Sequence, residues 1–272
     1  MITRFAPSPT GPLHLGHAWA AMVADDLGDM HLRIEDIDRQ RSKPHWEAAI
    51  FDDLHWLGLI WPEPVMRQSE RMAEYDDALD RLWSRGLLYP CICNRRDIRA
   101  AAAAPQEGAP LLGPDGVVYP GTCRAASRIG LRPRDVALRL DADAVGALTW
   151  TEKDRPQTMD PATFRRSIGD VVIARRDFAT SYHLAVVVDD AAQGIDLVTR
   201  GADLVEATPI HVALQTLLDL PTPGYHHHDL VRDGEGRRLA KRDDARSLAS
   251  YRDAGWSADA LKAHLRADRT AP

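Results

Sequence analysis

Apolar residues recur along the chain in two rhythms, one typical of strands and one typical of helices. Leu32 and Ile34 alternate with polar residues, which predicts a strand, and the apolar-rich run 2–5 leads into a proline-rich segment that excludes a helix. Elsewhere apolar residues recur every three or four positions, as on one face of a helix. These stripes are Ala20, Val23 and Leu27; Trp46, Ile50, Leu54 and Leu57; Met72, Tyr75, Leu79 and Leu82; and Ile210, Ala213, Leu214, Leu217 and Leu218. Strands that alternate with helices predict an α/β domain with a parallel sheet.

The middle of the chain departs from this rhythm. Residues 90–139 hold all three cysteines and a stretch rich in proline and glycine, so we predict an insertion there. Beyond it, the apolar run Ala185–Val188 predicts a strand buried on both faces, and residues 196–199 predict another strand. The predicted parts are the first half of the α/β domain at 1–89, the insertion at 90–139, the second half at 140–227, and a loop with a short helical end at 228–272.

Composition and charge narrow the class of protein only slightly. The 272 residues are 44% hydrophobic, which is enough to bury a core in one large domain or two small ones. We see no run near the ~20 apolar residues of a membrane helix, no secretory signal and no disulfide framework, which favours the cytosol. A net charge of −6 disfavours a nucleic-acid partner, but the basic clusters within 124–139 and 237–242 are either solvated faces or local phosphate-binding surfaces.

The most specific motif is the segment 4–17, which reads RFAPSPTGPLHLGH. A strand runs into a loop of proline and glycine and then into a helix, whose first backbone N–H groups can face phosphate oxygens. Glycine lets a nucleotide approach the backbone closely, and His14 and His17 share one face of the helix. Such a histidine pair alone is more often structural, but the whole string is far more specific.

This segment resembles the HIGH region of the glutamyl-tRNA synthetases, which are class I aminoacyl-tRNA synthetases. Four further elements follow in the family's order: LRIEDID at 32–38, YHLAVVVDD at 182–190, VTRGADL at 198–204, and GEGRRLAKR at 234–242, which is similar to the KMSKS loop. The resemblance implies a Rossmann-type parallel sheet with an inserted zinc-containing subdomain. It also implies an enzyme that activates glutamate with ATP and Mg²⁺.

The resemblance assigns the glutamate pocket to Arg4, Phe5, Ala6, Pro7, Ser8, Glu35, Tyr182 and Arg200. These residue types suit a substrate with two carboxylates and one ammonium group. Arg4 and Arg200 can each grip a carboxylate through paired hydrogen bonds. Glu35 can pair with the ammonium group, and Tyr182 can add a directed hydroxyl. Each residue alone is more simply explained as an ordinary ion pair or a core tyrosine, but the set is not.

The resemblance assigns ATP binding to His14, Gly16, His17 and Lys241, and catalysis to His14, His17 and Lys241. Catalysis here means stabilising the charge that develops on the phosphates. In the KMSKS-like loop, Arg238 keeps the positive charge of the family's first lysine, whereas Ala240 lacks the family's serine hydroxyl. The three histidines at 226–228 cannot chelate one ion in a strand, because adjacent side chains point to opposite faces. The family implies that one of them lies beside the nucleotide.

The cysteines form a second candidate site. Cys91 and Cys93 are separated by a long gap from Tyr119 and Cys123. Three thiolates and one oxygen ligand can hold a tetrahedral Zn²⁺, although three inert thiols explain the residues alone equally well. The resemblance favours the metal, because a short branch of the family, the glutamyl-queuosine tRNA(Asp) synthetases, carries a Cys-x-Cys…Tyr-x-x-x-Cys zinc set in this insertion.

Only 31 residues, 242–272, follow Lys241, whereas full-length glutamyl-tRNA synthetases continue into helical domains that read the anticodon. Residues 257–265 predict one helix there, so we expect no anticodon-binding domain and a monomer. The glutamyl-queuosine branch implies aspartate tRNA bearing queuosine as the acceptor, with the basic segment 124–139 against its backbone. The alternatives are a truncated conventional synthetase that charges the tRNA 3′ end, a non-catalytic tRNA-binding paralogue, and another adenylate-forming enzyme of the same superfamily.

Overall fold

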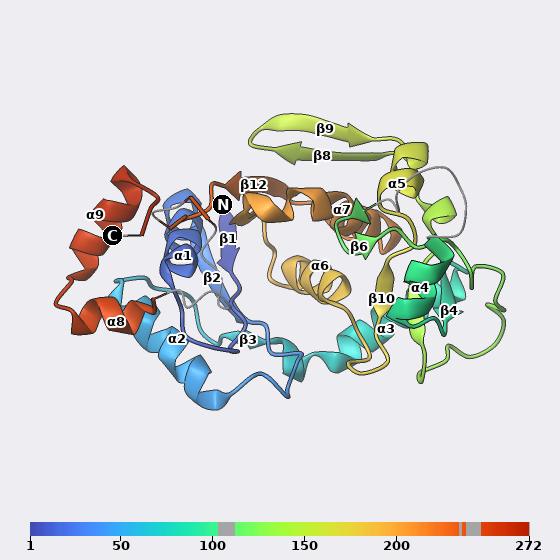
Figure 1. Cartoon of the computed structure of the whole chain (residues 1–272), viewed down its shortest axis with the longest axis horizontal. Coiled ribbons are helices and arrows are strands. Elements are labelled where there is room, and N and C mark those ends of the chain that lie inside the picture. Colours follow the sequence, from blue (N-terminus) through green and yellow to red (C-terminus); the bar gives the residue numbers. More distant parts are fainter. Residues whose placement is uncertain (103–111, 234–235, 238–245, 272) are drawn as a thin grey trace. The chain divides into compact units, whose positions relative to one another are not determined.

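The computed structural model describes residues 1–102, 112–233, 236–237 and 246–271 (Figure 1). The chain forms two compact units, each assembled from segments that are distant in sequence. The first unit comprises 1–70, 193–203 and 224–272, and the second comprises 71–192 and 204–223.

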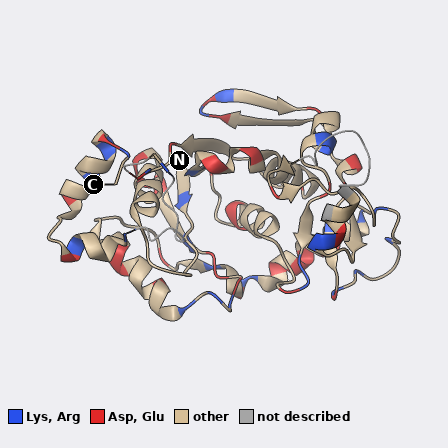
Figure 2. Cartoon of the chain, in the orientation of Figure 1, with Lys and Arg blue, Asp and Glu red and all other residues tan. Residues whose placement is uncertain are grey.

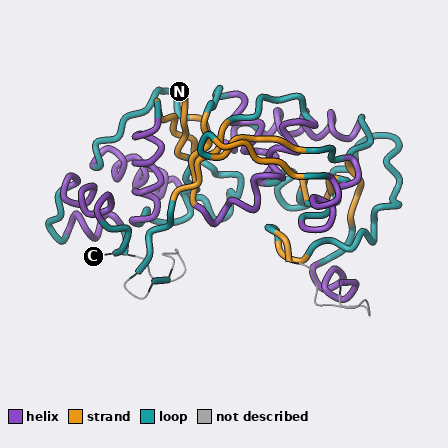
Figure 3. The backbone as a smooth tube through the Cα atoms, turned by 90° about the horizontal axis from the view of Figure 1, so that it is seen from above, coloured by secondary structure: helices purple, strands orange, loops and turns teal. Residues whose placement is uncertain are grey.

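The first unit is built on parallel strands with helices between them (Figures 1 and 3). Its sheet has the order β1-β2-β3, and a second parallel pair is formed by β11 and β12. Strand β11 lies beside β1, because the Asp196 amide donates to the Ile2 carbonyl at 2.9 Å. The elements are β1 Ile2–Phe5, α1 Leu15–Leu27, β2 Asp29–Ile34, α2 Pro44–Trp56, β3 Met66–Arg67, β11 Leu197–Gly201, β12 Gly224–His228, α8 Leu248–Asp253 and α9 Ala258–Ala267. The predicted parallel α/β sheet is confirmed.

One apolar core holds this unit together. Helix α1 buries seven of its residues, and the predicted stripe on α2 supplies Ile50, Leu54 and Leu57 to the same core. The Thr3 hydroxyl donates to the Ala24 carbonyl at 2.7 Å, which ties β1 to the helix above it. Burial of this kind contributes roughly 1.5–3 kcal/mol for each large apolar side chain. The core therefore fixes β1 and α1, and with them the loop that joins the two.

The second unit combines helices with short antiparallel strands. Its central sheet has the order β10-β7-β4, with β7 antiparallel to both neighbours. Two further antiparallel pairs are β5–β6 and β8–β9. The elements are α3 Met72–Ser84, β4 Leu88–Cys91, α4 Arg95–Ala102, β5 Leu112–Gly113, β6 Gly116–Val117, β7 Ala137–Leu140, β8 Leu148–Glu152, β9 Arg155–Met159, α5 Pro161–Ser167, β10 Val172–Ala174, α6 Tyr182–Ala192 and α7 Thr208–Leu217.

The predicted strand at Ala185–Val188 is wrong. These residues lie inside helix α6, and Leu184, Ala185, Val186 and Val187 are all buried. A continuous apolar run indicates that a segment is buried on every side. A fully buried helix has this pattern as well as a fully buried strand, so the pattern alone does not distinguish the two. The predicted helical stripes are confirmed in α1, α2, α3 and α7. Among the described helices, none combines the length and the apolar character that a bilayer crossing requires.

Candidate functional site

The two histidines of the first motif organise the start of α1. The Nδ1 atom of His14 accepts from the Gly16 amide at 3.1 Å, and that of His17 accepts from the His14 amide at 3.1 Å. Because each Nδ1 atom is an acceptor, the proton of each neutral ring sits on Nε2. A side chain at position 16 would place its Cβ 3.0 Å from the His14 ring, so glycine preserves this arrangement. Two N–H donors at a helix N-terminus suit the oxygens of a phosphate chain.

Two arginines lie near the carboxyl ends of neighbouring strands and are anchored there. Arg4, near the end of β1, is 5% exposed and donates from Nη1 to the Thr199 carbonyl at 2.6 Å. Arg200, in β11, is also 5% exposed and donates from Nε to His227 Nε2 at 3.0 Å. Its guanidinium lies 5.4 Å from the centre of the Tyr225 ring. These contacts fix the planes of both guanidinium groups, which a fork-shaped grip on a carboxylate requires.

Glu35 lies next to the loop that follows β1. Its amide donates to the Pro7 carbonyl at 3.0 Å, so the end of β2 is tied to the segment that contains Phe5, Ala6 and Ser8. The Glu35 carboxylate pairs with Arg33, a fully buried side chain, at 3.5 Å. Ligands of parallel α/β sheets bind at the carboxyl ends of the strands. Seven of the eight predicted pocket residues belong to this first unit, whereas Tyr182 begins α6 in the second unit, 38% exposed.

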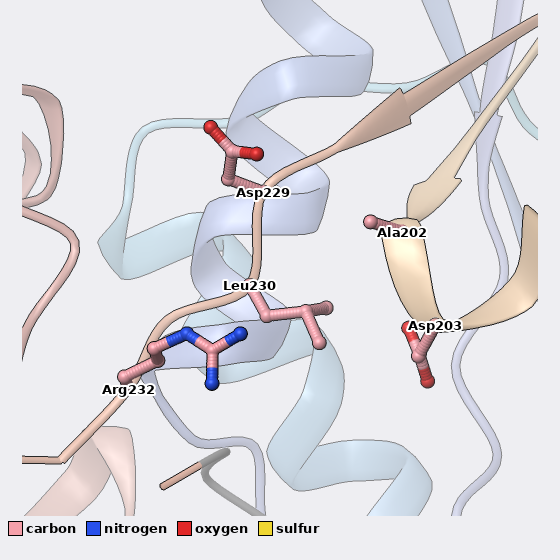
Figure 4. A pocket seen from close by; sticks show the side chains of 5 residues that line it. All are labelled: Ala202, Asp203, Asp229, Leu230 and Arg232. Atoms are coloured by element: carbon pink, nitrogen blue, oxygen red, sulfur yellow. The ribbon is translucent and has the colours of Figure 1, made fainter. Parts of the chain in front are cut away.

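A pocket of about 390 Å³ opens beyond the ends of β11 and β12. It is lined by Ala202, Asp203, Asp229, Leu230 and Arg232. Figure 4 shows the Leu230 side chain projecting toward Asp203, while the Asp229 side chain points the other way. From the sequence, Ala202 and Asp203 fall in the element VTRGADL at 198–204 but were given no role, and Asp229, Leu230 and Arg232 were not singled out. The usable signal for Ala202 and Asp203 was their position just after the predicted strand at 196–199.

His228 ends β12, immediately before Asp229 in the lining of this pocket. Its Nδ1 atom contacts the Asp229 carbonyl at 2.9 Å, and its buried Nε2 atom has no hydrogen-bond partner in the described part of the chain. The same holds for the indole N–H of Trp19, whose ring packs edge-on against His228. Burial lowers the pKa of His228, opposed by its contact with the Asp229 carbonyl, so the imidazole is held neutral. Lys241, Arg238 and Ala240 lie outside the described residues.

The four predicted metal ligands come together in the second unit. The sulfur atoms of Cys91, Cys93 and Cys123 lie within 4.8 Å of one another. The Tyr119 hydroxyl lies 3.4 Å from the Cys91 sulfur and 3.3 Å from the Cys93 sulfur. Three sulfurs and one oxygen around a common centre form a donor set that fits tetrahedral zinc. The cluster can therefore bind a metal such as zinc.

The electrostatics of this cluster differ from one thiol to the next. Burial raises the pKa of the Cys93 thiol. For Cys123, burial is outweighed by hydrogen bonds from Tyr119, the Ile92 backbone and the neighbouring thiols, and the pKa falls to about 7. The pKa of Tyr119 is raised by burial and by the adjacent thiols. A divalent ion would oppose the raised pKa of Cys93 and Tyr119 and lower the pKa of Cys123 further, because it favours the charged form of each ligand.

The predicted RNA-facing role of the basic segment 124–139 finds little support in the geometry. Acidic and basic residues are interspersed along the ribbon of this unit (Figure 2). Arg124 pairs with Asp170 at 2.8 Å and Arg128 with Asp141 at 2.7 Å. Arg132 and Arg134 share Asp76, and Arg139 is 7% exposed among the cysteines. The sequence showed a run of like charge, but the carboxylates that neutralise it come from other segments.

Comparison with known proteins gives consistent matches. The family profile of class I tRNA synthetases (E and Q), catalytic domain, matches residues 1–267. The glutamyl-Q tRNA(Asp) synthetase of Rhodobacter capsulatus is 60% identical over 269 residues, covering 94% of this chain and 96% of the relative. That of Nocardia farcinica is 43% identical, covering 96% of this chain and 82% of the relative. A crystal structure of a glutamate tRNA ligase from Elizabethkingia meningosepticum, in complex with its amino acid, superposes with a TM-score of 0.76 at 26% identity. This chain covers 59% of that ligase, and 96% of this chain is matched.

The parallel sheet, the histidine motif at its carboxyl end and these matches define a class I aminoacyl-tRNA synthetase catalytic domain of the glutamate and glutamine group. Within that class, the chain belongs to the family of glutamyl-Q tRNA(Asp) synthetases.

Proposed function

We propose that this chain activates L-glutamate with ATP and Mg²⁺ and transfers the glutamyl group to the queuosine base of aspartate tRNA. The observation that carries the first step is the pair of anchored arginines, Arg4 and Arg200, beside the loop that leads to His14. The acceptor rests on the relatives of this length, which are named as glutamyl-Q tRNA(Asp) synthetases at 60% and 43% identity.

In the first step, an α-carboxylate oxygen of glutamate attacks the α-phosphorus of ATP, and the bond to the β-phosphate breaks. Arg4 and Arg200 hold the substrate carboxylates, Glu35 pairs with its ammonium group, and Tyr182 donates its hydroxyl. The Nε2–H groups of His14 and His17 stabilise the charge on the phosphates. No protein nucleophile is needed, so alignment supplies most of the rate. In the second step, a hydroxyl of the queuosine ring attacks the glutamyl carbonyl carbon, and AMP leaves.

The nucleotide is proposed to occupy the pocket lined by Asp203, Leu230 and Arg232, near the Nε2 atom of His228, which has no partner among the described residues. Mg²⁺ accompanies its phosphates, and Lys241 steadies the pyrophosphate. Zinc, held by Cys91, Cys93, Cys123 and Tyr119, has a structural role in the second unit. We further expect a monomer that works in the cytosol.

Pyrophosphate exchange into ATP tests the activation step. The purified protein should exchange label with L-glutamate and without tRNA. Arg200→Ala should slow this exchange by roughly 30- to 1,000-fold, because losing a charge-assisted contact removes ~2–4 kcal/mol of transition-state stabilisation. Arg266→Ala serves as the control, since Arg266 is an exposed arginine of the same unit that pairs with the surface carboxylate of Asp26.

The rival functions give different outcomes. A non-catalytic paralogue would show no exchange with any amino acid. Another adenylate-forming enzyme of the superfamily would exchange with a different acid. Full exchange by the Arg200→Ala protein would mean that Arg200 does not hold the substrate.

A further inference from the structure

Arg139 contacts the proposed zinc ligands from a neighbouring strand. It lies in β7, which pairs with β4, the strand that ends at Cys91. Its Nε atom donates to the Cys91 sulfur at 3.2 Å, and the centre of its guanidinium lies 3.7 Å from the centre of the Tyr119 ring. Its Nη1 atom donates to the Asp170 carbonyl at 2.7 Å. Arg139 is 7% exposed, so these contacts are made away from water.

We propose that Arg139 is a positioning residue for the metal: it holds Cys91 and Tyr119 in the geometry that zinc requires and balances the negative charge of the ligand set. This inference rests on the zinc site proposed above.

The geometric part follows from where the ligands originate. Cys91 ends β4, whereas Tyr119 follows the hairpin β5–β6, so no regular element joins the two. The planar guanidinium of Arg139 touches both ligands: its edge donates to the Cys91 sulfur, and its face stacks on the Tyr119 ring. The bond to the Asp170 carbonyl sets the plane of that group, because a guanidinium is rigid and its donors have fixed directions. Groups that contact metal ligands orient them in this way in many metal sites.

The electrostatic part follows from counting charges. Three thiolates around one divalent ion leave a net negative charge, and a phenolate oxygen adds another. Cys91 is 2% exposed and Tyr119 is 5% exposed, so water screens this charge poorly. Arg139 is a cation that makes two contacts with the ligand set. It donates a hydrogen bond to the Cys91 sulfur and stacks on the Tyr119 ring. A buried guanidinium in this position stabilises the charged form of the whole set.

The test measures metal affinity instead of catalysis. The wild-type protein should hold about one zinc per chain by elemental analysis. R139M, which keeps the length of the side chain but removes its charge and donors, should bind zinc 10- to 100-fold more weakly in competition with a chromophoric chelator. R139K should fall between the two, because an ammonium group keeps the charge but cannot stack and donate at once. With cobalt in place of zinc, the thiolate-to-cobalt absorption of R139M should change in position or intensity.

R128M is the matched control. Arg128 is a partly buried arginine of the second unit. The centre of its guanidinium lies 5.4 Å from the centre of the Tyr89 ring, and it pairs with Asp141. It touches none of the four ligands, so R128M can lose stability but should keep wild-type zinc affinity and an unchanged cobalt spectrum.

Each outcome decides one of the two claims. Wild-type protein that binds no zinc refutes the zinc site itself. Wild-type protein that binds zinc, together with an R139M affinity within about twofold of it and an unchanged cobalt spectrum, overturns the role of Arg139. If R139M does not fold, R139K takes its place: zinc release to chelator at least about threefold faster supports the role, and a wild-type rate contradicts it.

Discussion

At the scale of single residues, Asp53 is a carboxylate on the buried face of α2. It is 3% exposed, and it pairs with Arg252 at 3.9 Å. Burial raises the pKa of Asp53 to about 6, an effect that Arg252 only partly offsets. The folded state therefore disfavours the charged form, and Asp53 destabilises the protein wherever it is ionised.

Because the pKa of Asp53 is higher in the folded state than in the unfolded state, its destabilising effect grows as the pH rises. The destabilisation is absent below about pH 4, where Asp53 is protonated in both the unfolded and the folded state, and it is complete once the pH has passed the folded pKa of about 6. Asp53→Asn should therefore raise the free energy of unfolding by about 1–3 kcal/mol at pH 8 and by about half as much at pH 5. Urea titrations at the two pH values measure this. Asp52→Asn, at the exposed neighbouring position, should change little, and an equal gain at both pH values for Asp53→Asn would contradict the explanation.

Residues of the candidate site were predictable where the sequence carried a spaced motif. Arg4 and Arg200 lie near the ends of strands, Glu35 directly follows one and His14 precedes a helix, so their placement could be inferred from the order of the motifs. Arg139 could not be found this way, because nothing in its sequence neighbourhood distinguishes it from four other arginines nearby. Its partners come from β4 and from the segment after β6, and only strand pairing brings them together.

At the scale of elements, helix α6 is joined to α3 by one buried carboxylate. Asp189 is fully buried and accepts from Arg71 Nε at 2.8 Å and from the Tyr75 hydroxyl at 2.8 Å. Because α6 begins at Tyr182, this contact fixes the helix that carries a proposed substrate residue.

Asp189→Asn should lower the free energy of unfolding by about 2–4 kcal/mol, because it leaves the Arg71 guanidinium without its buried carboxylate. Glu74 offers a control on the same arginine. It lies 3.1 Å from Arg71 Nη1 but is 45% exposed, so Glu74→Gln should cost less than about 1 kcal/mol. Urea unfolding of the two variants measures both values, and similar losses would mean that burial of the Asp189 pair is not what stabilises the unit.

At the scale of the whole molecule, the two units differ in how far the sequence reveals them. The first unit repeats strand, helix and strand along the chain, so its parallel sheet follows from periodicity and from the rules of crossover connections. The second unit is held by antiparallel pairing between β4, β7 and β10, whose three to four residues each are too short for a period to emerge. Its metal cluster was nevertheless predicted from the resemblance to the short branch of the family, because the cysteine spacing alone fits three inert thiols equally well.

The acceptor is a property of the whole molecule, and it can be tested with three tRNAs: glutamate tRNA, aspartate tRNA bearing queuosine, and aspartate tRNA lacking it. Labelled glutamate should appear only on the second, within the nuclease fragment that contains the anticodon loop, and oxidation of the queuosine ring before the reaction should abolish it. Because Arg124, Arg128 and Arg132 are paired with carboxylates of the chain, this basic segment should add little to the salt dependence of the transfer. Selectivity must then come from the unstacked loop bases and the modified base itself, which is how proteins usually read RNA loops. Label on the 3′ adenosine of glutamate tRNA would instead make the chain a conventional synthetase, and a steep salt dependence would show that the arginine pairs open to receive the RNA.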